Sequence, residues 1–263
     1  PDGIPIMGVA GDQQAALFGQ TCFQPGDAKC TYGTGSFILM NTGSKLKYSK
    51  HNLLTTIAWQ LGPKSPIVYA IEGGAFVCGA AVQWLRDGLK MIKSSSEVES
   101  LAQQVDDCGG VQFVPALTGL GAPFWQPQAT GLITGLTRGS TNAHIARATL
   151  EAMALQNCDI LESMQKDIGK KINKLSVDGG ACRNNLLMQM QADFLGTRIS
   201  RPKVIESTSV GAAFLAGHGV GLWPDLRKLK ELRELDHEFS PKMATARKKK
   251  RADEWRNAIR RAL

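Results

Sequence analysis

The chain has 263 residues, which allows one large domain or two small ones, and 43% hydrophobic residues, which allow a sizeable core. No apolar run approaches the length of a membrane span. The net charge of +8 is concentrated in residues 225–263, where 13 Lys and Arg face 7 Asp and Glu. The remainder is nearly neutral, so no nucleic-acid partner is expected. The run 247–251 is interpreted as a solvated segment before the last helix, with contact to an acidic partner as the alternative.

Six cysteines and four histidines are scattered along the chain, and no C-x-x-C pair occurs. Neither a zinc site nor a disulfide framework is therefore expected. The cysteines are interpreted as reduced core thiols of a cytoplasmic protein. The first residue is Pro1 rather than Met, and a strand-like run follows at once. We expect the chain to be part of a longer protein.

Strands and helices alternate along the sequence, which predicts an α/β domain. The first half predicts a buried strand at 4–9, a short helix at 13–19, a hairpin at 28–41, strands at 53–59 and 67–71, and a helix at 76–91. The second half predicts a strand at 111–114, a loop rich in Gly and Pro at 115–127, and a long helix at 143–166 with Ser140, Thr141 and Asn142 as N-cap candidates. A strand at 175–177 and helices at 184–195, 210–217 and 252–263 complete the pattern.

The turn of the first hairpin reads Thr31-Tyr-Gly-Thr-Gly-Ser-Phe37. Backbone N–H groups approach a phosphate closely only where no Cβ blocks the way, and Gly33 and Gly35 leave that path open. The hydroxyl of Thr34 adds a further donor. Hairpins also carry glycine for geometry alone, so the turn by itself supports a phosphate site and a plain turn equally.

Two other glycine turns strengthen the phosphate interpretation. In Ala10-Gly-Asp-Gln-Gln14, Asp12 is predicted at the end of the first strand, where ligands of open α/β sheets bind. Its carboxylate suits a base that accepts a hydroxyl proton during phosphoryl transfer, and the alternative is a helix cap. Gln13 either holds a substrate hydroxyl or is an ordinary first-turn residue.

The turn Val177-Asp-Gly-Gly-Ala181 follows an apolar run and precedes a helix. Its glycines would let a purine or a ribose phosphate lie against the backbone. Asn184 then either meets an adenine edge or caps the helix. Gly79 lies inside a predicted helix, where glycine is destabilising, so another helix or a ligand is expected close to it. Gln83 lies one turn later on the same face.

The sequence contains the motifs G-D-Q-Q-A-A-L-F-G-Q at 11–20, T-Y-G-T-G-S-F at 31–37, L-L-T-T-I-A-W at 53–59, Y-A-I-E-G at 69–73, P-A-L-T-G-L-G-A-P-F-W at 115–125, G-L-T-R-G at 135–139 and V-D-G-G-A-C-R-N-N at 177–185. Together these motifs resemble glycerol kinase over essentially the whole chain. The resemblance implies an α/β, ribonuclease-H-like (actin-like ATPase) domain, with a mixed sheet and helices on both faces. It implies that residues 1–263 form the C-terminal nucleotide-binding lobe, without the N-terminal lobe.

The resemblance also assigns roles to residues. It implies that Asp12 is the catalytic base for the hydroxyl of glycerol, that Gln13 binds glycerol and that Phe37 packs on its carbons. The implied nucleotide contacts are Gly33, Thr34, Gly35, Gly79, Gln83, Gly179, Gly180, Ala181 and Asn184. ATP and Mg²⁺ are the implied cofactors, and no metal ligand is assigned, although Asp12 is placed to reach the metal through water.

The expected reaction is ATP-dependent phosphorylation of glycerol to sn-glycerol 3-phosphate in a cytoplasmic enzyme, which as a full-length protein is expected to be a homo-oligomer. The isolated chain is expected to be nearly inactive, because the remaining glycerol and phosphate contacts belong to the N-terminal lobe. Two alternatives stay open: a kinase for another polyol or sugar of the same superfamily, and a non-enzymatic actin-like module that binds nucleotide.

Overall fold

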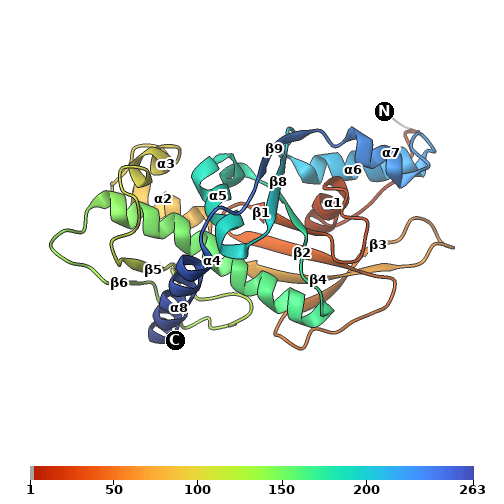
Figure 1. The fold of residues 1–263 in the computed structure, drawn as a ribbon. Helices are drawn as coiled ribbons and strands as arrows, with labels where there is room; N and C mark the ends of the chain where they lie inside the picture. Colours follow the sequence, from red (N-terminus) through yellow and green to blue (C-terminus); the bar gives the residue numbers. More distant parts are fainter. Residues whose placement is uncertain (1–2) are drawn as a thin grey trace.

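The computed structural model describes residues 3–263, which form a layered α/β unit (Figure 1). The strands are β1 Ala28–Tyr32, β2 Ser36–Gly43, β3 Leu54–Trp59, β4 Val68–Ala75, β5 Gln112–Val114, β6 Leu132–Thr134, β7 Lys174–Asp178, β8 Arg198–Pro202 and β9 Leu235–Phe239. The helices are α1 Asp12–Gly19, α2 Gly79–Asp87, α3 Glu97–Ala102, α4 Asn142–Ile168, α5 Asn185–Leu195, α6 Ser207–Gly219, α7 Leu226–Leu232 and α8 Thr245–Ala262, with a 3₁₀ turn at Gly180–Arg183.

A seven-stranded mixed sheet in the order β3-β4-β2-β1-β7-β8-β9 forms the centre. β1 pairs antiparallel with β2 and parallel with β7, so the sheet changes direction next to β1. Side chains alternate between the two faces of each strand. On β2, Ile38 and Met40 join the core beneath α4, while Leu39 joins the core formed with α1 and α6. Helices therefore cover both faces, which confirms the predicted mixed-sheet α/β fold.

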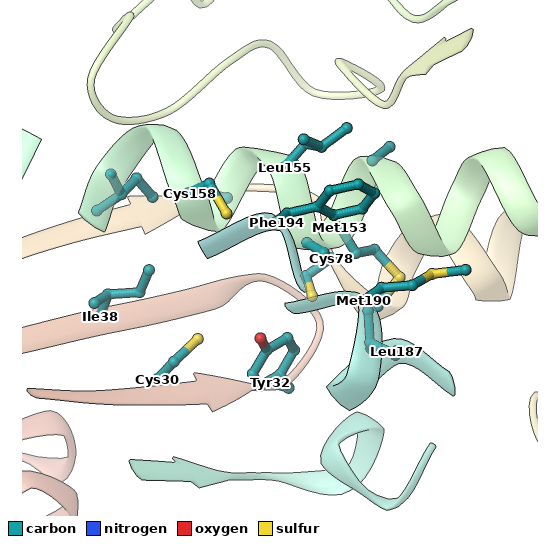
Figure 2. Close-up of a cluster of buried hydrophobic side chains, with 14 of the residues drawn as sticks. Cys30, Tyr32, Ile38, Cys78, Met153, Leu155, Cys158, Leu187, Met190 and Phe194 are labelled. Carbon is teal, nitrogen blue, oxygen red and sulfur yellow. The ribbon is translucent and has the colours of Figure 1, made fainter. Parts of the chain in front are cut away.

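The larger core lies between the sheet and α4. Figure 2 shows Cys30, Tyr32 and Ile38 on the first hairpin on the side of α4 toward which Met153 points, while Leu155 points away from the hairpin. Leu187, Met190 and Phe194 of α5 close the same cluster. The 27-residue helix α4 begins at a capping box, in which Thr141 and His144 satisfy each other's backbone N–H groups. The cap and the apolar surface explain why this helix is the longest element of the described chain.

Residues 4–9 do not form the buried strand that their apolar pattern predicts. Ile4, Ile6 and Val9 are 70%, 84% and 86% exposed. The backbone of this segment instead runs along α6, where a Cβ added to Gly8 would lie 2.7 Å from the backbone nitrogen of Ala216. Because no strand pairs with the segment within residues 3–263, its side chains do not become part of a sheet face that packs on a core.

The remaining predicted elements are confirmed with shifted ends, and several short ones were not predicted. The helix predicted at 76–91 begins only at Gly79 and ends at Asp87. The unpredicted elements are α3, α7, β6, β8 and β9. β8 reads Arg-Ile-Ser-Arg-Pro, and β9 reads Leu-Asp-His-Glu-Phe. Such polar sequences become strands through their pairing with each other and with β7 rather than through their own apolar pattern.

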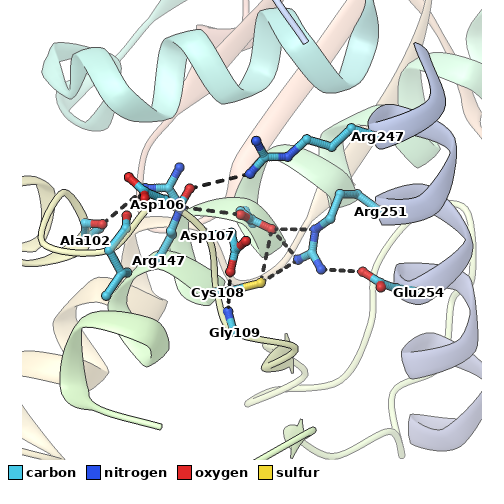
Figure 3. Close-up of polar contacts among 11 residues, drawn as sticks. Ala102, Asp106, Asp107, Cys108, Gly109, Arg147, Arg247, Arg251 and Glu254 are labelled. Carbon is cyan, nitrogen blue, oxygen red and sulfur yellow. Dashed lines mark hydrogen bonds and ion pairs between the residues drawn. The ribbon is translucent and has the colours of Figure 1, made fainter. Parts of the chain in front are cut away.

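The basic run 247–251 is part of α8, which begins at Thr245 rather than at the predicted residue 252. Figure 3 shows Arg251 turned into the protein, where its guanidinium pairs with Glu254 and with the buried Glu151 of α4. The Nη2 atom of Arg251 also lies 2.8 Å from the Sγ atom of Cys108. The interpretation of the run as a solvated segment is therefore wrong for Arg251, because a partner distant in sequence neutralises its charge.

All six cysteines are buried and free, as predicted for core thiols. Burial raises the pKa of Cys78 to about 12, which keeps this thiol protonated at neutral pH. None of the helices in residues 3–263 combines the length and the apolar character that a membrane crossing requires.

Candidate functional site

A cavity of about 400 Å³ lies beside the turn of the first hairpin, between α2, α4 and the start of α5. We call it the hairpin pocket. Sequence-predicted nucleotide residues that line it are Gly33, Thr34, Gly79, Gln83, Gly180, Ala181 and Asn184. Three separate segments of the sequence therefore meet at one cavity, although nothing in their spacing requires it.

Backbone hydrogen bonds fix the hairpin turn against the first turn of α2. The N–H groups of Cys78 and Ala80 donate to the carbonyl of Thr34 at 2.8 and 3.0 Å, and that of Gly79 donates to Gly33 at 3.0 Å. A Cβ on Gly79 would lie 2.6 Å from the carbonyl oxygen of Gly33. The close approach expected at Gly79 is thus made by the hairpin backbone, which leaves no room for a side chain.

The opposite wall comes from the end of β7 and the start of α5. Gly179 has φ of +83°, and an added Cβ would lie 2.5 Å from the carbonyl oxygen of Tyr32. Gly180 differs, because an added Cβ would meet nothing within 4 Å. Asn184 caps α5, accepting a hydrogen bond from the backbone N–H of Leu187 at 2.8 Å. Of its two alternatives, the capping role is therefore present, and the side chain still lines the cavity.

Two predicted nucleotide residues lie behind the wall rather than on it. Gly179 is one, and Gly35 is the other, where a Cβ would lie 2.6 Å from the carbonyl oxygen of Ala75. Both glycines allow the backbone to form the turns whose neighbouring residues line the cavity. Lining residues that were not predicted include Ser95, Ser96, Val98, Glu99 and Arg183. The first four lie in or next to the unpredicted α3, so no motif marked them, whereas Arg183 lies within the motif at 177–185.

Apolar side chains form the floor of the hairpin pocket, and polar groups form its rim. The floor consists of Tyr32, Val82, Leu150, Met153 and Leu187, several of which appear together in Figure 2. The rim offers Gln83, Arg183 and two serine hydroxyls, together with the backbone of Gly180. A floor of this kind suits a flat, apolar ring, and the rim suits the hydroxyl and phosphate groups attached to it.

A second group of residues lies on the opposite face of the same hairpin, close to its turn, and we call it the Asp12 edge: Asp12, Gln13, Lys29 and Phe37. Asp12 is exposed and is the first residue of α1, with Gly11 as N-cap. Its carboxylate accepts from the backbone N–H of Gln13 at 2.8 Å and from the Gln13 side-chain amide at 3.2 Å. The predicted strand before Asp12 does not exist, so Asp12 owes its place to α1 rather than to a strand end.

Phe37 belongs to β2 and is 40% exposed. It pairs in register with Thr31 on β1, just before the turn that lines the hairpin pocket. Gln13 approaches the same place from α1, because its side-chain oxygen accepts from the ammonium of Lys29, which also donates to the carbonyl oxygen of Phe37 at 3.3 Å. The structure thus brings the three predicted substrate residues to one end of one hairpin.

Lys29 was not predicted as a site residue. A lysine between Ala28 and Cys30 on a strand is typical of a solvent-facing position, yet this side chain is 0% exposed. Burial lowers the pKa of Lys29, while the charges of Asp178 and Glu72 act in the opposite direction. Burial also raises the pKa of Glu72, against the charge of Lys29. The sequence carries no signal for this burial, because a charged residue between two apolar ones is the ordinary pattern of a strand with one exposed face.

The C-terminal domain of the FGGY family of carbohydrate kinases matches residues 28–220 of this chain. The chain belongs to the FGGY family of carbohydrate kinases. The glycerol kinase of Bdellovibrio bacteriovorus is 63% identical over 261 residues, which cover 99% of this chain and 52% of that protein. The resemblance to glycerol kinase in the motifs is thereby confirmed. The FGGY chain spans about half the length of the curated relatives it matches.

Solved structures confirm the actin-like fold of this FGGY chain. A crystal structure of Plasmodium falciparum glycerol kinase with ADP superposes with a TM-score of 0.91 at 41% identity, covering 96% of this chain and 50% of that one. Xylulose kinase from Rhodospirillum rubrum superposes with a TM-score of 0.80 at 24% identity, over 99% of this chain and 51% of the other. At that identity the second comparison concerns the fold alone.

Proposed function

We propose that this chain is the C-terminal, nucleotide-binding lobe of an ATP-dependent glycerol kinase that produces sn-glycerol 3-phosphate. The observation that carries the proposal is the first hairpin, whose turn lines the hairpin pocket on one face and which carries the Asp12 edge on the other face. A nucleotide in the pocket would direct its phosphates along the turn toward a hydroxyl held at the edge. The 63% identity to a glycerol kinase supports glycerol as that substrate.

In the proposed reaction, Asp12 accepts the proton of a glycerol hydroxyl while its oxygen attacks the γ-phosphorus of ATP. The bond from that phosphorus to the β–γ bridging oxygen breaks, and ADP leaves. Gln13 donates to a glycerol hydroxyl, and Phe37 packs on the carbons. Thr34 and the backbone N–H groups of its turn stabilise charge on the phosphoryl oxygens. Asp12 is exposed, so it is accessible to a hydroxyl of this kind.

The hairpin pocket fits ATP, because its apolar floor suits adenine and Gly180 leaves open space for a sugar or phosphate. The residues fit Mg²⁺ less well. Within residues 3–263, no three His, Cys, Asp or Glu side chains gather closely enough to hold a metal ion. We therefore assign no residue of this chain to magnesium, which would enter with the phosphates of ATP.

Other parts of the proposal concern the full-length protein. Its N-terminal lobe would supply the remaining contacts to glycerol and phosphate, and the enzyme would be a homo-oligomer. A cytoplasmic location is supported by six buried, free thiols, which suit a reducing compartment.

The test is a substrate screen of the full-length enzyme that contains this chain. Phosphorylation is followed by ADP release with glycerol, xylulose, gluconate and other polyols, each over a range of concentrations. The proposal expects the highest kcat/KM with glycerol. A clear preference for another sugar or polyol would overturn the glycerol assignment, and ATP binding without phosphorylation of any of them would favour a non-enzymatic module.

A further inference from the structure

Lys29 is a fully buried cation whose hydrogen-bond partners are all neutral oxygens. Its ammonium donates to the hydroxyl of Thr31 at 2.8 Å, to the carbonyl oxygen of Phe37 at 3.3 Å and to the side-chain oxygen of Gln13. The partners come from β1, β2 and α1, so the three donors of one ammonium are used on three different elements.

Such an arrangement lowers the stability of the fold if its only purpose is packing. A buried charge loses its hydration, and neutral acceptors replace only part of it, so an apolar residue of similar length would serve the core better. Leu39, which pairs with Lys29 on β2, is such a residue on the same face of the sheet. The charge of Lys29 therefore points to a requirement other than packing.

The hydrogen bonds from Lys29 to Gln13 and from Gln13 to Asp12 indicate what this requirement is. An ammonium group only donates, so the side chain of Gln13 must turn its oxygen toward Lys29 and its NH₂ group away. That NH₂ group lies 3.2 Å from the second carboxylate oxygen of Asp12. Lys29 thereby determines which end of the Gln13 amide is offered at the exposed edge. With the amide reversed, Gln13 would present an acceptor beside a carboxylate, which is itself an acceptor.

We propose that Lys29 is a positioning residue for the polyol, which holds Gln13 so that its NH₂ group faces the substrate hydroxyls and Asp12. The inference rests on the proposed function, since it assigns Lys29 to the same reaction. Lys29 contacts neither substrate. It acts through Gln13 and, by its bond to the carbonyl of Phe37, through the backbone of the residue that packs on the polyol carbons.

The experiment is a double-mutant cycle in the full-length enzyme, using Lys29→Met, Gln13→Ala and the double variant. Methionine keeps the unbranched stem and removes the three donors. For Lys29→Met the KM for glycerol should rise roughly tenfold, with a fall in kcat, because Gln13 and Asp12 lose their alignment. The KM for ATP should stay within about twofold, because the hairpin pocket is unchanged.

The cycle separates positioning from a structural role. In the Gln13→Ala background, Lys29→Met should change kcat/KM by only about twofold, because the residue through which it acts is gone. Lys248→Met is the matched control: it removes an ammonium that donates to the carbonyl of Leu195 at 2.9 Å, on α8 and away from both regions. It should leave both KM values unchanged.

Three results would overturn the proposal. One is an unchanged KM for glycerol in a folded Lys29→Met enzyme, and another is a full additive effect in the Gln13→Ala background. If Lys29→Met does not fold, the same cycle is run with Lys29→Gln, which keeps one NH₂ donor and should give a smaller shift. If neither variant folds, Lys29 is a structural residue only. Wild-type activity on glycerol is measured first, so failure of the proposed function is recognised separately.

Discussion

The two faces of the first hairpin present different kinds of site. The hairpin pocket at the turn has an apolar floor, and its walls come from segments of this chain that hydrogen-bond to one another. The Asp12 edge on the opposite face is open, with Asp12 exposed and Phe37 40% exposed, above the buried cation Lys29. This chain alone forms the hairpin pocket. We expect residues outside this chain to supply the remaining contacts at the Asp12 edge.

The largest expected effect belongs to the Asp12 edge. In the full-length enzyme, Asp12→Asn should lower kcat by roughly 10²–10⁴-fold, because Asn is nearly isosteric but accepts no proton. Affinity for ATP should not change, because Asp12 does not line the pocket. Steady-state kinetics and ATP titration measure both, with the exposed Asp253→Asn on α8 as control. A variant within a few-fold of wild type would leave Asp12 as only a first-turn helix residue.

Gly179→Ala tests whether the pocket wall is part of the fold. The backbone has φ of +83°, and the new Cβ would meet the carbonyl oxygen of Tyr32. The free energy of unfolding should fall by about 1–3 kcal/mol or more, as measured by denaturant titration. Gly221→Ala is the control, since it has φ of +77° but open space, and should be milder. Equal losses in both variants would show that the contact with Tyr32 contributes nothing.

The smallest effect concerns Glu72, which lies near Lys29 and Asp12. Burial raises the pKa of Glu72 in the folded state. The folded protein therefore keeps this proton longer than the unfolded chain, so wild type loses stability as pH rises through that range. Glu72→Gln should gain stability relative to wild type between about pH 4 and about pH 7, by well under about 1 kcal/mol, because water screens this partly exposed carboxyl group. Denaturant midpoints at both pH values decide this, and a difference independent of pH would contradict it.

Local signals explain what the sequence predicted well. The hairpin turn needs glycine at 35, where a Cβ would lie 2.6 Å from the carbonyl oxygen of Ala75, and Asn184 caps α5. Both features lie within a few residues of the structure they determine. The close approach predicted at Gly79 is present, but Gly79 is the first residue of α2 rather than an interior one, and the approaching group is the backbone of Gly33 rather than another helix or a ligand.

What the sequence could not predict depends on distant partners. The apolar pattern at 4–9 is that of a strand, but a strand also requires a neighbour, and residues 3–263 provide none for it. Arg251 is buried because Glu151 lies 100 positions away in the sequence and beside it in space. Lys29 is buried because α1 folds over its strand and offers Gln13. The partners in these contacts are too far apart in the sequence for a local pattern to reveal them.

The nucleotide assignment of the hairpin pocket is tested most directly by calorimetric titration of the 263-residue chain with ADP, beside its Gly180→Val variant. We expect the folded chain to bind ADP while phosphorylating glycerol hardly at all. Gly180→Val should weaken binding by roughly tenfold with little loss of stability, because an added Cβ there meets only open space. A folded chain that does not bind ADP, or a folded variant with unchanged affinity, would contradict the claim that the hairpin pocket is the nucleotide site.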